Sequence, residues 1–311
     1  MANPTSPRRA LVIGCGGVAG GAWSIAALHQ LEQQLGWDCR DADILIGTSA
    51  GAVIASLLGS GISVDQLLAC QQGTSDTCHW NHDTDTGGAL PPLPGARLTG
   101  KQLIRKGLRG EVSALTALCG LMPAGQFDMQ AFRKLVNGAA NGNPWVSHPA
   151  TWIMAVDTTS GRRIPFGKGG APSVRIDDAV CASYGVPCWC PPVTVDGRTY
   201  IDGGVASPTS ADMLVDAAVE EVVILAPMAS RQPDKPWHPF ERIERRVRRY
   251  MTGIVDREVA ALEKAGKRVI RIEPQAEDLK AFGYNMMDPG RRKQVLATAI
   301  ASTPATVRAA L

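Results

Sequence analysis

The sequence has no run of about 18 or more apolar residues, so we expect no transmembrane span. The apolar stretch that follows its N-terminal pair of arginines is also too short for an export signal. Arg8 and Arg9 precede an apolar stretch that ends at Cys15, which superficially resembles an export or lipoprotein signal. Only Ala10–Gly14 lie between them, whereas an export signal needs an apolar core of about 7–15 residues. We therefore predict no signal peptide.

Excess charge and paired metal-binding cysteines are lacking as well. The formal net charge is +3, close to balance, so the charge gives no reason to expect a nucleic-acid partner, and we predict none. The eight cysteines form no pair of Cys-x-x-Cys motifs, and most lie in apolar runs, as free cysteines in a reducing compartment do. Cys78, His79 and His82 are metal ligands by type, but their spacing matches no standard zinc site. We expect a cytoplasmic protein with no cofactor and no metal.

The order of apolar segments predicts a single α/β domain over residues 1–311. Its expected core is a central, mostly parallel sheet flanked by helices, because strands and helices alternate along the chain. Residues 71–145 begin with a long polar loop and are expected to form an inserted helical cap or lid. Strands are expected at 9–13, 43–46, 151–156, 199–201, 221–226 and 268–272, and helices at 22–35, 50–58, 98–120, 129–136, 176–184, 239–265 and 291–311.

The segment Gly47-Thr48-Ser49-Ala50-Gly51 carries a G-x-S-x-G pattern between an expected strand and an expected helix. Gly47 and Gly51 permit a tight turn and a close approach of neighbouring backbone. Such a turn exposes the Ser49 hydroxyl at a helix N-terminus, where the helix dipole favours developing negative charge. The pattern predicts a catalytic nucleophile; the simpler alternative is a serine N-cap.

A second glycine-rich turn follows the first expected strand. Gly14, Gly16 and Ala19 fit the G-x-G-x-x-[GA] fingerprint of a dinucleotide-binding turn. That fold needs an acidic residue at the end of the second strand, where this sequence has the Ser49 turn instead. Because adjacent parallel strands would bring residues 16–18 beside Ser49, we expect the backbone N–H groups of Gly16, Gly17 and Val18 to form an oxyanion hole.

No histidine follows an expected strand in a way that would place it in a catalytic loop near Ser49. The candidate partner is instead Asp202, at the end of a short expected strand and before Gly203 and Gly204. Taken alone, Asp-Gly is more typical of an ordinary turn.

Four blocks in order resemble the patatin-like phospholipase family. They are Cys15–Gly20, Gly47–Gly51, the Ala182–Pro187 stretch and Asp202–Gly204. The resemblance implies a patatin-like fold and a serine lipid acyl hydrolase that uses a Ser49–Asp202 dyad without a metal. Its substrate would be a lipid or another acyl ester.

Two positions depart from the family pattern. Cys15 replaces the first glycine of the oxyanion block, and Ala19 stands where arginine is common. Losing the guanidinium removes a bidentate anion contact, so we do not expect a phosphate head group to be held here as it is in members that have the arginine. Two other functions stay open: acyl transfer by the same dyad, and a lipid-binding regulatory pseudoenzyme.

The segment 239–254 has a basic amphipathic pattern. Its apolar residues recur at helical spacing, and Trp237 and Phe240 are candidate interfacial anchors. One interpretation is an ordinary surface helix that packs on the sheet; the other is peripheral contact with an anionic membrane. The apolar stripe is Phe240, Ile243, Val247, Met251 and Ile254, and the cations are Arg242, Arg245, Arg246, Arg248 and Arg249.

Overall fold

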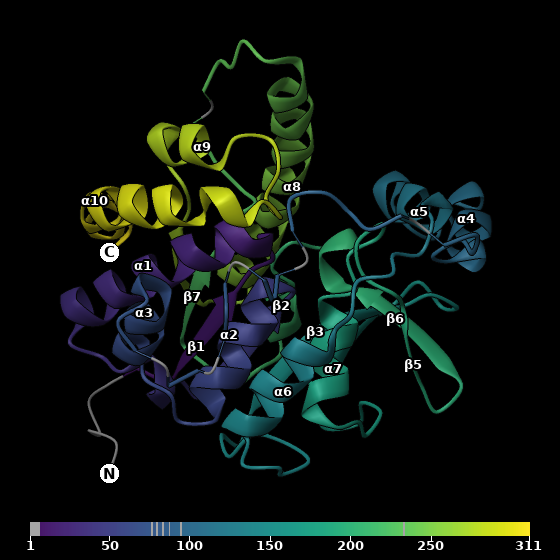
Figure 1. Cartoon of the computed structure of the whole chain (residues 1–311). Helices are drawn as coiled ribbons and strands as arrows, with labels where there is room; N and C mark the ends of the chain where they lie inside the picture. The colour runs from purple at the N-terminus through teal and green to yellow at the C-terminus, as the bar shows by residue number, and fades with distance from the viewer. Residues whose placement is uncertain are drawn as a thin grey trace.

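The fold is built around one sheet in the order β5-β6-β3-β2-β1-β7-β8, with β4 paired to β3 (Figure 1). The computed structural model describes residues 7–311 except 76, 79, 83, 87, 94 and 233. Strands β3, β2, β1, β7 and β8 run parallel to one another. Strands β4 and β6 are antiparallel to β3, and β5 is antiparallel to β6. The strands are β1 (Arg9–Ile13), β2 (Ile44–Thr48), β3 (Thr151–Asp157), β4 (Arg163–Phe166), β5 (Val193–Val195), β6 (Arg198–Asp202), β7 (Glu221–Leu225) and β8 (Arg268–Ile272).

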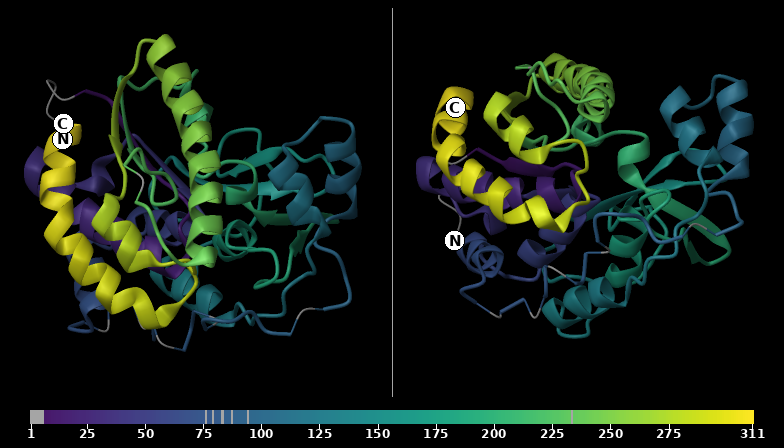
Figure 2. Two further views of the ribbon diagram at one scale, coloured as in Figure 1. Left: turned by 90° about the horizontal axis from the view of Figure 1, so that it is seen from above. Right: turned by 45° about the horizontal axis from the view of Figure 1, so that its top comes forward.

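Helices cover both faces of this sheet, which confirms the predicted mostly parallel α/β architecture (Figures 1 and 2). Parallel strands need such crossover helices and read as continuous apolar runs. The helices are α1 (Gly17–Leu35), α2 (Ala50–Gly59), α3 (Val64–Gln72), α4 (Lys101–Leu108), α5 (Ala114–Leu121), α6 (Gln130–Ala139), α7 (Ile176–Ser183), α8 (Pro239–Lys264), α9 (Ala276–Phe282) and α10 (Arg292–Ala310), with short 3-10 turns η1 (Cys39–Asp41), η2 (Gly203–Val205), η3 (Ala211–Leu214) and η4 (Pro289–Arg291).

Alternating side chains of the central strand divide the interior into two layers. Leu11 and Ile13 of β1 join a core shared with α1, α2, α7, α9 and α10. Ala10 and Val12 face the opposite way, into a core shared with α8 and η3. The period of two along a strand therefore explains why both faces are apolar. None of the helices in the described part of the chain is long and apolar enough to cross a membrane.

Several predicted boundaries are wrong. The first helix begins at Gly17 and not at residue 22, so the glycine-rich turn is itself the start of α1. The expected helix at 98–120 is two helices, because the chain reverses at Gly110, whose φ is +71°. Helices α3 and α9 and strands β4 and β5 were not predicted.

The region 71–145 is divided between two places. The hairpin of α4 and α5 packs beside the end of β6 through a small apolar cluster that includes Leu103 and Cys119 with Val156, Ile201 and Val205. In contrast, α6 packs against α7 and α2 in the layer under the sheet. Figure 1 draws α4 and α5 at one side of the molecule, well apart from α6. The α4–α5 hairpin of this region therefore packs at the end of the sheet where Asp202 lies.

Candidate active site

The turn between β2 and α2 holds Ser49 in a strained backbone conformation. Its φ is +57° and its ψ is −119°, a region that residues with a Cβ rarely adopt. The two flanking glycines allow this turn because backbone lies against them. A Cβ on Gly51 would overlap the carbonyl of Ile13, and one on Gly47 would overlap the carbonyl of Gly51. The tight strand–turn–helix geometry expected around Ser49 is therefore present; its role as a nucleophile stays a prediction.

A second serine holds this turn from α7. The Ser49 backbone N–H donates to Oγ of Ser183 over 2.8 Å, and the Ser183 hydroxyl donates to the carbonyl of Met154 over 2.6 Å. Both bonds are buried, so each is strengthened by its apolar surroundings. Sequence reasoning gave Ser183 no role. Its place in the Ala182–Pro187 block was the only signal that could have found it.

Asp202 lies at the end of β6, and its pairing with Ala155 of β3, one residue beyond the partner of Thr48, places it level with Ser49. The backbone N–H of Gly204 donates to Oδ1 of Asp202 over 2.7 Å, within the 3-10 turn that Gly203 begins. Burial raises the pKa of Asp202 from 3.8 to about 7, although hydrogen bonds from the Ser49 side chain and Gly204 lower it. A carboxyl poised near neutral pH suits a general base.

The glycine-rich turn after β1 presents unused backbone donors beside Ser49. The parallel register of β1 and β2 places Ile13 opposite Gly47. The N–H of Cys15 donates to the carbonyl of Pro208, and that of Ala19 to the carbonyl of Met286.

Between these two anchored N–H groups, those of Gly16, Gly17 and Val18 donate to no protein group in the part of the chain that is described. First-turn N–H groups of a helix have no partner within the helix, so they are available to an anion. Gly17 has φ of +57°, and a Cβ there would lie 2.7 Å from the carbonyl oxygen of Met286. Glycine is therefore required at this position.

Ser49 and Asp202 line one cavity of about 340 Å³, which we call the dyad cavity. Its other walls are apolar and include Trp189 and Cys188. The remaining lining residues are Cys15, Gly16, Gly17, Leu115, Cys119, Met122, Val186, Pro187, Gly204, Val205, Met228, Met251, Met286 and Met287. Among the described residues no lysine, arginine or histidine lines this cavity.

The Cys15 substitution places a thiol in this cavity. Its Sγ lies where a Cβ on Gly204 would be only 2.9 Å away, so the two residues are in close contact. Burial and the neighbouring Asp202 carboxyl raise the pKa of the Cys15 thiol well above its ordinary value. A neutral, buried thiol is a poor nucleophile. Cys15 therefore contributes shape and polarizability to the wall.

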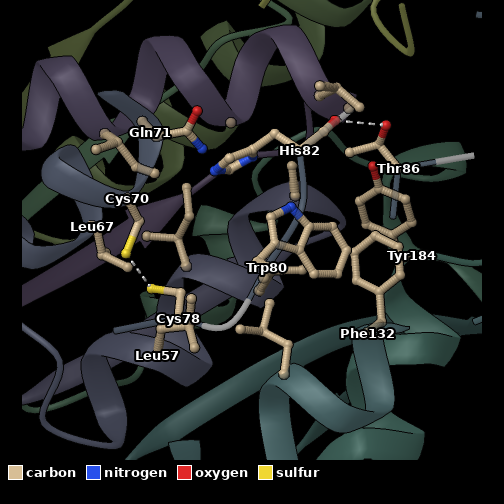
Figure 3. Close-up of a pocket in the computed structure, with 18 residues that line it drawn as sticks. Leu57, Leu67, Cys70, Gln71, Cys78, Trp80, His82, Thr86, Phe132 and Tyr184 are labelled. Atoms are coloured by element: carbon tan, nitrogen blue, oxygen red, sulfur yellow. Dashed lines mark hydrogen bonds between the residues drawn. The ribbon is translucent and has the colours of Figure 1, made fainter. Parts of the chain in front are cut away.

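A second apolar cavity, of about 90 Å³, lies beneath the elbow (Figure 3). Gly17 lines both cavities, and Ala50, next to Ser49, lines this one. Trp80, Phe132 and Tyr184 form one side of it. The ring centroid of Phe132 lies 4.8 Å from that of Trp80 and 4.4 Å from that of Tyr184, and both pairs are tilted. Figure 3 shows these rings facing Leu57, Leu67 and the contacting thiols of Cys70 and Cys78 across the cavity.

The hydroxyl of Tyr184 contacts Sδ of Met287 at 4.0 Å. Tyr184 lines the second cavity and Met287 lines the dyad cavity. This contact and Gly17 are therefore shared boundaries of the two cavities. The loop after α3 forms part of the second cavity. This loop was predicted to belong to a polar cap or lid. His79 and Asp83 of that loop lie outside the described residues.

Helix α8 contributes a buried cation that sequence reasoning assigned to the surface. The guanidinium of Arg248 donates to Oε1 of Glu244 over 2.6 Å and to the carbonyl of Pro227 over 2.5 Å. Arg245 is also buried, bonded to Glu244 and over 2.6 Å to Asp234. The prediction that Arg245 and Arg248 form an exposed cationic face is therefore wrong. Each guanidinium has carboxylate partners, which permits its burial.

The histidines lie away from the dyad cavity where the structure describes them. His29 contacts Asp65, His148 bonds the carbonyl of Ala42, and His238 stacks on Tyr284. His82 lines the second cavity. No group of three or more histidine, cysteine or acidic side chains within the described residues could hold a metal ion.

Comparison with known proteins identifies the family of the chain. The family model described as patatin-like phospholipase matches residues 11–215, about two thirds of the chain. The chain belongs to the patatin-like phospholipase family. Comparison with curated protein sequences gives no match.

Among solved structures, the chain is similar to VipD from Legionella pneumophila, with 13% identity and a TM-score of 0.45 over 99% of this chain and 68% of VipD. It is also similar to the type III effector protein ExoU, with 14% identity and a TM-score of 0.38 over 97% of this chain and 53% of ExoU. The chain thus spans about two thirds of the length of VipD and about half that of ExoU.

Proposed function

We propose that this chain is a serine acyl hydrolase of lipids in which Ser49 is the nucleophile and Asp202 the base. The observation that carries the proposal is that a strained, buried serine and a carboxyl with a pKa of about 7 share one apolar cavity. Membership of a phospholipase family supports it.

The reaction would proceed in two steps. Ser49 Oγ attacks the ester carbonyl while Asp202 takes its proton, and the N–H groups of Gly16, Gly17 and Val18 stabilise the oxyanion. The alcohol leaves with that proton, and an acyl ester of Ser49 remains. Asp202 then activates a water, which releases the fatty acid and restores the serine.

The walls of the dyad cavity favour the acyl part of a lipid over its head group. No cationic side chain lines it among the described residues, and Ala19 provides no guanidinium at the turn. A phosphate would thus find only backbone donors, whereas an ester-linked chain would bury apolar surface against methionines and Trp189. We propose a neutral ester, a lysolipid or an acyl thioester as the reacting group, held by its acyl chain.

Labelling with a fluorophosphonate tests the nucleophile directly. The folded protein should be labelled at Ser49, and Ser49→Ala should remove the label. A Cys15→Ala variant is the matched control, because it changes a cavity wall next to the same turn and should still be labelled. If native protein with normal secondary structure resists labelling, the hydrolase proposal is wrong and a lipid-binding role without catalysis gains support.

Products from a mixed lipid extract would define the reaction further. Incubation with the native protein should release free fatty acids that the Ser49→Ala variant does not release. Added alcohol acceptors should leave the fatty acid as the main product. If acylated acceptor forms instead, the same dyad performs acyl transfer.

A further inference from the structure

The start of α8 displays large apolar side chains to solvent. Trp237 is 96% exposed, Phe240 59%, Ile243 56% and Tyr284, from the segment after α9, 49%. We call these four residues the aromatic tip. Exposed apolar residues are common singly, but a cluster of them marks a surface that meets an apolar partner.

Two rings of this cluster, those of Phe240 and Tyr284, pack against each other and against the neighbouring ring of His238. The His238 ring stacks on Tyr284 with centroids 5.7 Å apart and planes 11° apart. Phe240 lies 5.5 Å from His238 and 5.6 Å from Tyr284. The ring contacts join two segments of the chain, so the exposed apolar surface is an organised part of the fold.

A strip of unpaired cations borders the aromatic tip. Arg242, Arg246 and Arg249 are exposed, and no ion pair joins them to an acidic side chain within the described residues. Their spacing of four and three residues places them on one side of the helix, and Ile243, three residues before Arg246, borders that side. The cations that α8 uses internally, Arg245 and Arg248, are buried and paired with Asp234 and Glu244.

The aromatic tip also adjoins the dyad cavity. Met251 lies farther along α8 and Met286 two residues after Tyr284, and both line that cavity. Arg248 joins the two segments, because its guanidinium contacts Sδ of Met286 at 3.7 Å. A surface bound to the tip would therefore lie near the walls around Ser49.

Two further segments near this cavity expose leucines. The side-chain amide of Asn285 donates to the carbonyl of Ala89 over 2.6 Å, which places the loop with Leu90 and Leu93 beside the tip. These two leucines are 81% and 88% exposed. Helix α5 exposes Leu118 and Leu121, at 51% and 50%, while its Leu115 lines the cavity. In Figure 1, α5 lies to the right of α8.

We propose that the aromatic tip, with Arg242, Arg246 and Arg249, docks this chain on an anionic lipid surface. Aromatic side chains next to a row of arginines match the two layers of such a surface, an apolar interior and anionic head groups. Docking in this way brings the dyad cavity to the membrane, a consequence that rests on the proposed function. The binding itself does not depend on catalysis.

Vesicle co-sedimentation tests the docking in the Ser49→Ala background, where the lipid is not consumed. The full chain is mixed at low salt with vesicles of phosphatidylcholine, or with vesicles in which one lipid in three is phosphatidylglycerol. We expect binding to rise with the anionic lipid. Arg242→Gln and Arg246→Gln should each weaken it roughly fivefold, the ratio equivalent to about 1 kcal/mol per cation near an anionic surface. The double variant Trp237→Ala, Phe240→Ala should weaken it by more than about tenfold.

Matched variants away from the tip serve as controls. Arg257→Gln removes an exposed arginine farther along α8, and Ile300→Ala removes a partly exposed apolar side chain of α10. Both should bind as the parent does. If the parent binds neither kind of vesicle, or if controls and tip variants lose binding equally, the proposal is wrong; a missing vesicle interaction would leave the tip to a protein partner.

A soluble short-chain ester separates this test from the test of the proposed function. With Ser49 restored, the Trp237→Ala, Phe240→Ala variant should hydrolyse that ester at the native rate but act more slowly on vesicles. A loss on both substrates would contradict the docking role. An inactive native protein that still binds anionic vesicles would contradict the hydrolase proposal and leave the docking proposal supported.

Discussion

Replacing Asp202 with asparagine should make the protein inactive and, at neutral pH, more stable. The carboxyl has an ordinary pKa of 3.8 and a pKa of about 7 in the folded chain, because burial disfavours its charged form. Asparagine keeps an oxygen for the Gly204 N–H bond and carries no charge to bury. The variant therefore avoids a cost, which is the free energy of unfolding that the native protein loses by burying a charged carboxylate.

The pH dependence of that cost has a definite sign. Since the folded pKa of Asp202 lies above the unfolded one, the unfolded chain releases the proton first as pH rises, and native stability falls between about pH 4 and pH 7. Below this window both states are protonated and the cost vanishes. Above it the cost levels off at about 4 kcal/mol, from about 1.4 kcal/mol for each unit of pKa difference. Between pH 5 and pH 8 the stability advantage of the variant should grow by about 2–3 kcal/mol.

Urea unfolding of both proteins, followed by tryptophan fluorescence at the two pH values, measures this change. The contributions of other titrating groups cancel when the two proteins are compared at the same pH. Glu258, whose pKa burial also raises to about 7, is one of them. Hydrolysis of a soluble ester should be lost by orders of magnitude in the variant and, in the native protein, should decline below about pH 7 as the base is protonated. An advantage that is equal at pH 5 and pH 8 would refute the account of a buried, destabilised carboxyl.

Three further changes test the surroundings of the site. Ser183→Ala should lower kcat about tenfold with the fold intact, because the Ser49 backbone N–H loses its partner; steady-state kinetics with a soluble ester measures this, and an unchanged kcat would contradict the role. Glu244→Gln should reduce the free energy of unfolding by about 3–5 kcal/mol, because it leaves Arg248 with a buried, uncompensated charge; urea titration measures the loss. The second cavity shares Gly17 with the dyad cavity, so we expect it to receive the end of a long acyl chain; Val53→Trp should fill it and reduce activity on long-chain esters while sparing short-chain ones, and a uniform loss across chain lengths would contradict this.

Local patterns in the sequence predict much of the fold and the positions of the main site residues. The elbow at Ser49 is readable because a strand, two glycines and a helix are adjacent in the chain. The mostly parallel sheet is readable because apolar strands alternate with helical periodicity. Asp202 is readable only through the order of the four blocks, since its own surroundings are those of an ordinary turn.

Features that depend on distant packing could not be predicted. Ser183 bonds a residue 134 positions away, and no local pattern encodes that contact. The charged face of α8 was assigned to solvent because arginine is usually exposed, whereas Arg248 meets Glu244 and Pro227 in the interior. The start of α1 was missed because glycine disfavours helices. Close packing explains the glycine at position 20, where a Cβ would lie 3.1 Å from Pro227.

The order of strands has a consequence for how the site can come into existence. The family match ends at residue 215 and already contains both Ser49 and Asp202. Yet β1, which carries the glycine turn, pairs on one side with β7, made of residues 221–225, and β7 in turn pairs with β8. When synthesis has just passed Asp202, the nascent chain therefore contains both residues of the dyad, but one edge of β1 has no strand to pair with. Activity should arise only late in synthesis, once the last strands close that edge.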